Sequence, residues 1–289
     1  MTDQRIVDII VEEILARSGA PADFAGQRAD AVPVQSAPLE ITSGAGLPYA
    51  AEKTGGEVQS DITAFIKEST AARVCIGKAG PRLKTGTLLK LRADHAAARD
   101  AVFKDVDESI LKSLGLFMVQ TRCANKNEFL TRPDLGRVFD DENIAKIKRG
   151  CSKAQVQIYV SDGLSSSAVT ANLKDILPVI LDGLKASSIS AGAPFFVKYG
   201  RVHAMDAVSE ALECDVVCVL IGERPGLITS ESMSAYIAYH ATVGMPEARR
   251  TVVSNIHANG LAPVEAGAYI VDVIRMMLEV KASGVDLRR

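Results

Sequence analysis

The feature that most constrains the fold of this chain is an unbroken apolar segment that leads into a charged, glycine-containing loop. Six apolar residues at 216–221 precede Gly222-Glu223-Arg224-Pro225-Gly226. An apolar run without alternation is typical of a strand buried on both faces, as in parallel sheets. Pro-Gly suits the centre of a type II turn, so we expect the chain to reverse there with Glu223 near the strand end. Because ligands of open α/β sheets bind beyond the carboxyl ends of strands, the segment indicates either a ligand site or a buried Glu-Arg pair that fixes the loop.

Composition excludes several classes of protein. The 33 basic and 35 acidic residues nearly cancel, which gives no electrostatic basis for binding nucleic acid. No apolar run approaches the roughly 18 residues of a membrane span, and the N-terminus has no secretory signal, so we expect neither membrane insertion nor export. The five cysteines are scattered without a Cys-x-x-Cys pair, which predicts neither a zinc site nor a disulfide framework. A cytoplasmic protein without a metal site of its own is the expectation.

Strand and helix signals alternate after Cys151. The expected strands are 157–160, 195–199, 216–221 and 250–254, and the expected helices are 168–184, 204–212 and 263–283. Repeated β–loop–α units predict a parallel, right-handed, Rossmann-like sheet with its loops gathered at one edge. The fold class is therefore α/β, with residues 151–289 as the Rossmann-like C-terminal domain.

The first half of the chain has different patterns. An amphipathic helix is predicted at 3–17, followed by linker sequence rich in Ala, Pro, Gly and Ser, and together they make a flexible tail at 1–58. A mostly helical domain is predicted at 59–150. The tethered helix either docks onto another protein or packs back on its own domain. The basic loop at 73–82 lacks the spacing of a nucleotide P-loop, and it either meets acidic groups of a partner subunit or is simply solvated.

Polar loops are expected to converge at one edge of the sheet, namely 161–163, 200–202, 222–224 and 254–257. The chain has no nucleophile elbow, no His-Glu-x-x-His and no Gly-x-Gly-x-x-Gly after a strand, so no catalytic set and no NAD or FAD site is indicated. The mixture of acceptors and donors is typical of a docking surface for a polar ligand that carries amides. His257, near a strand end, is either a ligand or base, or a histidine whose nitrogens are satisfied within the structure.

Residues 255–260 have the form Asn-x-His-x-x-Gly. This differs by one residue from the Asp-x-His-x-x-Gly with which some cobalamin proteins place a histidine on cobalt. The aspartate of that motif orients the imidazole, and asparagine cannot supply its charge. We therefore do not expect His257 to be an axial ligand.

Several longer segments together resemble the small (light) subunit of ethanolamine ammonia-lyase. In chain order they are 73–75, 79–82, 93–95, 130–134, 160–165, 194–202, 222–227, 254–257 and 281–284. The resemblance covers roughly residues 60–289, and a series of long motifs in the right order is more specific than any one short pattern.

The resemblance implies an ammonia-lyase, a carbon–nitrogen lyase that is active only together with a large subunit. The enzyme converts ethanolamine to acetaldehyde and ammonia by a radical route that starts with homolysis of the cobalt–carbon bond of adenosylcobalamin (coenzyme B12). In this family the large subunit, of the TIM-barrel type, holds the substrate. The small subunit helps to bind and cover the corrin, and the dimethylbenzimidazole base stays on cobalt. No catalytic residue is then expected here, because the cofactor carries the chemistry.

The cobalamin contacts of the family fall on Val202, Glu223 and Val252 of this chain. Glu223 would accept from corrin carboxamide N–H groups, and Val202 would offer an apolar contact or a backbone group. The family often has cysteine where this chain has Val252, so a backbone contact is what would survive there. The resemblance also implies packaging in a bacterial microcompartment, with the 3–17 helix docking to shell or core proteins.

Three other interpretations stay open. A non-catalytic module would bind a cobalamin or a nucleotide tightly by itself, whereas a light chain needs its partner. An independent hydrolase would use Asp162, His257 and one serine of 161–167, for which there is no recognised geometry. A purely structural subunit would use the edge loops for interface contacts alone.

Overall fold

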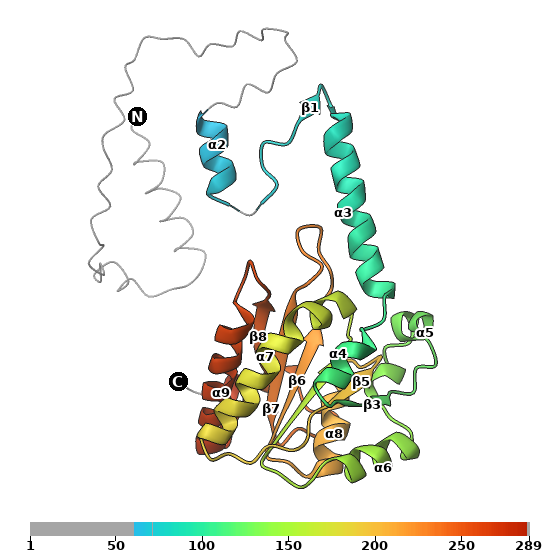
Figure 1. The fold of residues 1–289 in the computed structure, drawn as a ribbon, viewed down its shortest axis with the longest axis vertical. Coiled ribbons are helices and arrows are strands. Elements are labelled where there is room, and N and C mark those ends of the chain that lie inside the picture. The colour runs from blue at the N-terminus through green and yellow to red at the C-terminus, as the bar shows by residue number, and fades with distance from the viewer. Residues whose placement is uncertain (1–60, 71, 288–289) are drawn as a thin grey trace, which may run out of the picture. The chain divides into compact units, whose positions relative to one another are not determined.

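The computed structural model describes residues 61–70 and 72–287 (Figure 1). The tail predicted at 1–58, with its helix at 3–17, lies outside the described residues. From Ile62 onward the chain forms one compact unit. No helix in the described ranges combines the length and the apolar character that a bilayer crossing requires.

A mixed six-stranded sheet is the centre of the part of the chain that is described (Figure 1). Its order is β3-β5-β4-β6-β7-β8. The strands are β3 (Phe117–Gln120), β4 (Val156–Ser161), β5 (Phe195–Lys198), β6 (Val216–Gly222), β7 (Met233–Tyr239) and β8 (Thr251–Ile256). The first four in spatial order are mutually parallel, and β7 runs antiparallel to both of its neighbours.

The α/β class is confirmed, but the expectation of a parallel sheet is wrong at β7. The segment 233–239 mixes small, aromatic and polar side chains and shows neither an apolar run nor a clean alternation, so it was missed as a strand. Because β8 is in turn antiparallel to β7, it points the same way as β6. The carboxyl ends of β4, β5, β6 and β8 therefore still lie at one edge, as expected. The Rossmann-like assignment of the domain stays a prediction.

Helices cover both faces of this sheet. On one face α7 (Ser166–Ala186) and α9 (Pro263–Val280) pack on each other and on the apolar side chains of β4, β6 and β7. On the other face lie α6 (Asp141–Gly150) and α8 (Ala204–Leu212). All residues of β4 and β6 are buried, because both of their faces are covered. The apolar run at 216–221 is thus part of a central strand.

The remaining elements belong to the first half of the chain or to short connections. The helices are α2 (Asp61–Glu68), α3 (Thr85–Phe103), α4 (Glu108–Ser113) and α5 (Lys126–Thr131), and a two-stranded sheet pairs β1 (Lys78–Ala79) with β2 (Arg82–Leu83). Short 3-10 helices span Leu135–Arg137, Glu247–Arg249 and Gly284–Asp286.

The region expected to be mostly helical also contributes a strand to the main sheet. Strand β3 pairs in parallel with β5, with Val119 opposite Val197. Only four residues long, β3 follows α4 and the turn at Gly115, whose φ is 67°. A strand this short leaves little periodicity to detect. The first half of the chain therefore helps to build the same sheet as the second half, and a domain division between residues 150 and 151 stays a prediction.

Candidate functional site

The loops that follow β4, β5, β6 and β8 meet at one edge of the sheet, as the direction of these strands requires. Asp162, Gly200, Glu223 and His257 lie at or just after the ends of the four strands. The structure gives these positions different surroundings. Asp162 and His257 have both of their side-chain polar atoms paired within the protein, whereas only one carboxylate oxygen of Glu223 is paired.

Asp162 connects the ends of β4 and β5 through hydrogen bonds of its carboxylate. The backbone N–H groups of Tyr199 and Gly163 donate to its Oδ1 at 2.8 and 3.0 Å. Its Oδ2 lies 3.5 Å from Nζ of Lys126, whose ammonium is held over the rings of Phe129 and Tyr199. Burial raises the pKa of this carboxyl group above its usual value, against the opposing effects of Lys126 and the backbone donors. Both carboxylate oxygens of Asp162 therefore have partners inside the protein.

His257 is satisfied by its own loop. Its Nδ1 accepts from the N–H of Asn259 at 3.2 Å, so its Nε2 is the donor to Oδ1 of Asn255 at 2.9 Å. Both ring nitrogens are therefore used, and the ring is buried. This matches the structural alternative offered for His257. Among the described residues no hydrogen bond joins His257 to Asp162, so the structure gives no support to the interpretation as a hydrolase.

Arg201 is likewise used within the protein. Its Nη2 donates to the carbonyl of Phe129 at 2.7 Å, and its guanidinium carbon lies 4.2 Å from the centre of that ring. The alternative that Glu223 and Arg224 form a buried pair that fixes the 222–226 loop is wrong. Arg224 is exposed, and no ion pair joins the two among the described residues.

Glu223 has a different partner, Tyr236 of β7. The Tyr236 hydroxyl donates to Oε1 of Glu223 at 3.0 Å. The Glu223 N–H donates to the carbonyl of Ser232 at 3.0 Å, which extends the β6–β7 pairing by one step. Burial, and then the Glu223 charge, raise the pKa of Tyr236 to about 12. The phenol therefore stays a donor at neutral pH, and within the described residues the second oxygen of Glu223 accepts no hydrogen bond.

The expected type II turn at Pro225-Gly226 is wrong in its detail. Such a turn needs a positive φ at its glycine, and Gly226 does not have one. Its N–H donates instead to the carbonyl of Thr229 at 2.9 Å. The consequence drawn for Glu223 holds all the same, because the pairing with Ser232 keeps it at the end of β6.

Three side chains form a row across the sheet beside Glu223, and their exposure increases from β6 to β8. Val219 of β6 pairs with Tyr236 of β7, which pairs with Val252 of β8. The three share the face that α8 covers over β6. Val219 is fully buried, Tyr236 is half-buried, and Val252 is 45% exposed. The helical layer thus stops short of the sheet's edge and leaves an open surface made of an apolar row and one carboxylate.

Two of the three predicted cofactor contacts, Glu223 and Val252, are neighbours of the same side chain, that of Tyr236. Glu223 accepts from Tyr236, and Val252 lies opposite Tyr236 on the next strand. Val202, in the turn before α8, packs against the same apolar layer as Tyr236. Tyr236 itself was missed in the sequence. Its place depends on a hairpin partner in a strand that the pattern did not reveal.

A second feature that the sequence did not signal is an ion pair next to this open surface. Arg250, at the start of β8, donates to both carboxylate oxygens of Asp206 on α8 at 2.8 and 2.7 Å. Both side chains are almost fully buried. Burial raises the pKa of the Asp206 carboxyl group, and the Arg250 guanidinium opposes that rise. Near the pair, His203 contacts Glu247, and burial lowers the pKa of the His203 imidazole.

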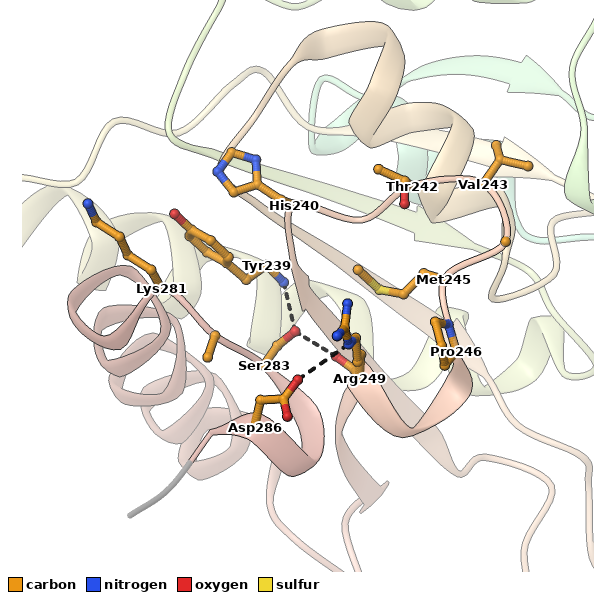
Figure 2. A pocket seen from close by; sticks show the side chains of 12 residues that line it. Tyr239, His240, Thr242, Val243, Met245, Pro246, Arg249, Lys281, Ser283 and Asp286 are labelled. Atoms are coloured by element: carbon orange, nitrogen blue, oxygen red, sulfur yellow. Dashed lines mark hydrogen bonds and ion pairs between the residues drawn. The ribbon is translucent and has the colours of Figure 1, made fainter.

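A hollow of about 550 Å³ lies at the opposite edge of the sheet, where β7 ends (Figure 2). Ser283 crosses it at one side, accepting from the N–H of Tyr239 and donating to the carbonyl of Arg249. Arg249 also pairs with Asp286 at 3.3 Å. None of the predicted cofactor contacts lines this hollow. Its polar groups hold the end of α9 to the start of β8.

Comparison with known proteins gives a consistent result. The family model described as "Ethanolamine ammonia-lyase light chain (EutC)" matches residues 60–288. The chain is 63% identical over 223 residues to the ethanolamine ammonia-lyase small subunit of Clostridium tetani, which covers 77% of this chain and 76% of that protein. It is 56% identical over 224 residues to the small subunit of Listeria monocytogenes serovar 1/2a, with the same coverage. A match over most of the chain and identities at this level show that the chain belongs to the ethanolamine ammonia-lyase light-chain (small-subunit) family.

Proposed function

We propose that this chain is the small subunit of an adenosylcobalamin-dependent ethanolamine ammonia-lyase, which converts ethanolamine to acetaldehyde and ammonia by a radical mechanism. The observation that carries the proposal is the 63% identity to a small subunit of that enzyme. When bound, the cofactor would supply the initial radical by homolysis of its cobalt–carbon bond. The protein's part would be to bind, orient and cover the corrin.

The open surface beside β8 has the chemistry that a corrin edge needs. Corrin side chains end in carboxamides, whose N–H groups need acceptors. Tyr236 holds one oxygen of Glu223 and leaves the other for such a donor. A hydrogen bond to a charged group contributes about 1.5–3 kcal/mol. Glu223 is then the polar anchor of the site, and Tyr236 orients it.

The two valines would line the rest of the contact. Val252 presents an exposed side chain on the edge strand, and Val202 lies in the turn that starts α8. Backbone groups on the outer side of an edge strand have no ladder partner, so they could also meet a ligand. Because Val keeps the backbone N–H and C=O of the family's cysteine, a backbone contact at position 252 would be preserved.

The substrate site would belong to the large subunit, of the TIM-barrel type. The edge residues that could have served as acid or base, Asp162 and His257, are both satisfied inside this chain. A chain that offers a ligand surface and no available acid–base pair there suits a covering role. Activity would require both subunits and the cofactor.

Reconstitution tests this proposal. Purified full-length chain, the large subunit and their mixture are assayed with ethanolamine for acetaldehyde release, with and without adenosylcobalamin. We expect turnover only with both chains and the cofactor. No turnover from a correctly folded pair would mean that the family's reaction does not transfer to this chain. Tight cobalamin binding by this chain alone would favour the alternative, a non-catalytic cobalamin- or nucleotide-binding module.

The segment before residue 60 lies outside the family match and would serve localisation in a bacterial microcompartment of the cytoplasm. Its amphipathic pattern at 3–17 would dock to shell or core proteins. Deleting residues 1–20 should leave activity unchanged and release the enzyme from the compartment. Sedimentation of the variant with isolated compartments, measured beside the full chain, checks this. Co-sedimentation equal to that of the full chain would contradict it.

A further inference from the structure

The Asn-x-His-x-x-Gly motif at 255–260 lies at the ligand edge and has no part in the contacts proposed above. Strand β8 has a bulge just before it, because the three-residue step from Val253 to Ile256 lies opposite a two-residue step of β7. Val253 and Ile256 both pack in the core with α7 and α9, and the extra residue leaves Asn255 exposed. Asn255 has a φ of 63°, which asparagine adopts more readily than most residues. The bulge therefore brings an amide side chain to the surface close to Val252.

Hydrogen bonds fix which way this amide points. The N–H of Asn259 donates to Nδ1 of His257, and a backbone N–H can only donate, so Nδ1 carries no proton. The proton of the ring is therefore on Nε2, which lies 2.9 Å from the Asn255 side chain. The atom that faces it is the oxygen, Oδ1, because the amide nitrogen does not accept. His257 thus sets the orientation of the Asn255 amide and leaves Nδ2 on the other side.

Gly260 is required for the same arrangement. A Cβ atom at this position would lie 2.3 Å from the carbonyl oxygen of Asn255, and 2.7 Å from both Nδ2 of Asn255 and Nε2 of His257. Because these distances are shorter than any van der Waals contact, a side chain at 260 would displace the amide or the imidazole. The three defined positions of the motif therefore act on one group. Asn255 carries the amide, His257 orients it, and Gly260 leaves room for both.

The free end of this amide is a hydrogen-bond donor at the ligand edge. Asn255 is exposed, and within the described residues its Nδ2 donates no hydrogen bond. A side chain that is already held in one orientation loses less conformational freedom when it binds a ligand. Two oriented N–H groups without a partner are suited to a ligand that presents carbonyl oxygens.

Asn255 and Glu223 lie near the same level of the sheet. Gly222 of β6 pairs with Met233 of β7, which pairs with Ile256 of β8. Glu223 and Asn255 are the chain neighbours of the two ends of this row, so their backbones are two strands apart, about 10 Å. One position offers a free acceptor and the other a free donor. A carboxamide has a group for each, an N–H for the acceptor and a carbonyl oxygen for the donor.

We propose that Asn255 is a further cobalamin contact, whose Nδ2 donates to the carbonyl oxygen of a corrin carboxamide, and that His257 is the positioning residue that holds the amide for it. The inference rests on the proposed function, since it adds a second polar contact to the same cofactor. The pair is selective for amides. A rim of carboxylates would suit Asn255 but would be repelled by Glu223, and a rim of apolar groups would leave both without partners.

The test is equilibrium binding of adenosylcobalamin to the assembled enzyme, with urea unfolding of each variant as the measure of folding. Asn255→Asp keeps Oδ1 for His257 and replaces the donor by a second acceptor. Asn255→Gly removes the side chain and keeps the backbone conformation, because glycine adopts a φ of 63° without strain. Asn259→Asp is the matched control, because Asn259 is exposed in the same loop and contributes only its backbone N–H to the arrangement.

Asn255→Gly should weaken binding about fivefold, and Asn255→Asp at least about tenfold because its carboxylate faces the ligand carbonyl, while Asn259→Asp stays within about twofold. Binding by both Asn255 variants equal to wild type would overturn the inference and leave the proposed function standing. Equal losses in the two Asp variants without a loss in Asn255→Gly would also overturn it, because the charge of the loop would then be the cause. A wild-type pair that binds no adenosylcobalamin would instead refute the proposed function itself.

Variants of His257 test its positioning role. His257→Gln keeps a donor and an acceptor and should retain the affinity within about twofold, whereas His257→Phe removes both nitrogens and should weaken binding about fivefold. In the Asn255→Gly background His257→Phe should have no further effect on binding, because no amide is left to orient. A further loss in that background would show that His257 does not act through Asn255.

Discussion

Two carboxylates on the same side of the sheet, Asp206 and Glu223, have opposite surroundings. Asp206 is buried, and both of its oxygens are held by the guanidinium of Arg250. Glu223 is half-buried, and one oxygen accepts from the neutral hydroxyl of Tyr236. The first arrangement satisfies the charge completely inside the protein, and the second satisfies only half of the hydrogen-bonding capacity. The comparison teaches that the incomplete set, and not the stronger pair, marks the surface suited to a ligand.

The largest effect should come from breaking the buried pair. Arg250→Met leaves Asp206 without its cation in a dry environment, and we expect the free energy of unfolding to fall by about 3–5 kcal/mol. Urea unfolding measures this. Arg275→Met is the matched control, because Arg275 pairs with Asp272 on the surface and such pairs contribute about 0–1 kcal/mol.

Replacing both members of the buried pair tests whether the loss of stability comes from the unpaired charge of Asp206. The double variant Asp206→Leu with Arg250→Met removes the stranded charge, so it should be more stable than Arg250→Met alone. If the single and double variants unfold at the same urea concentration, Asp206 is not charged in the folded protein, and the contrast with Glu223 loses its basis.

The next effect concerns binding and should leave stability nearly unchanged. Glu223→Ala removes the half-satisfied acceptor, and we expect the affinity of the assembled enzyme for adenosylcobalamin to fall about 10- to 100-fold. Equilibrium binding followed by the cofactor's absorbance measures it. Glu231→Ala, in the same connection between β6 and β7, changes an exposed carboxylate and should have no effect. Unchanged affinity in Glu223→Ala would remove Glu223 from the site.

Tyr236→Phe keeps the ring and removes the donor that orients Glu223. The lost hydrogen bond, about 1 kcal/mol, should weaken cobalamin binding about fivefold. In the Glu223→Ala background the same change should add little, because the two side chains act as one unit. Additive effects of the two changes would show that Tyr236 acts independently of Glu223.

The ionisation of Tyr236 gives this pair a pH signature. The folded-state pKa of about 12 lies above the ordinary value of 10, so the stability that the phenol contributes is complete below pH 10 and is lost as pH rises toward 12. Because burial is the largest cause, Glu223→Gln should lower this pKa only in part. The difference in ultraviolet phenolate absorbance between each protein and its Tyr236→Phe counterpart measures it. A return to 10 in Glu223→Gln would mean that charge, not burial, dominates.

The smallest effect is expected at the edge strand. Val252→Cys restores the residue that the family often has, and the affinity for cobalamin should stay within about twofold if the contact is made by the backbone. Binding measured as for Glu223→Ala decides this. A tenfold change in either direction would assign the contact to the side chain.

Much of the sheet could be predicted because burial of a strand on both faces requires apolar residues, and these are visible in the sequence. The run at 216–221 is apolar because β6 is covered on both faces, and the helix predicted at 204–212 has the observed bounds. Strand β7 was missed although five of its seven residues are buried, because Ser234 and the alanines interrupt its apolar run. A strand covered on both faces shows no alternation, so only an unbroken apolar run could have revealed it.

The candidate site also has a part that could be predicted from the sequence and a part that could not. Glu223 and the edge to which it belongs could be placed from the strand that precedes them. Its partner Tyr236 could not, because the hairpin that joins them was not visible. The pairing of Asp206 with Arg250 spans 44 residues and depends on the packing of α8 against the start of β8. A local pattern carries no information on which distant charge a buried carboxylate will meet.

The antiparallel strand β7 also sets the distance between the two strands on either side of it, β6 and β8. Neighbouring strands lie about 4.8 Å apart, so the single antiparallel insertion places the backbone of β8 roughly 10 Å from that of β6. An edge built from adjacent parallel strands would bring their two loops half as far apart. A flat molecule bound here, as proposed, would thus be supported at two well-separated points, a carboxylate beside one strand and an apolar side chain two strands away. The direction of one strand would then set the lateral distance between the two contacts of such a ligand.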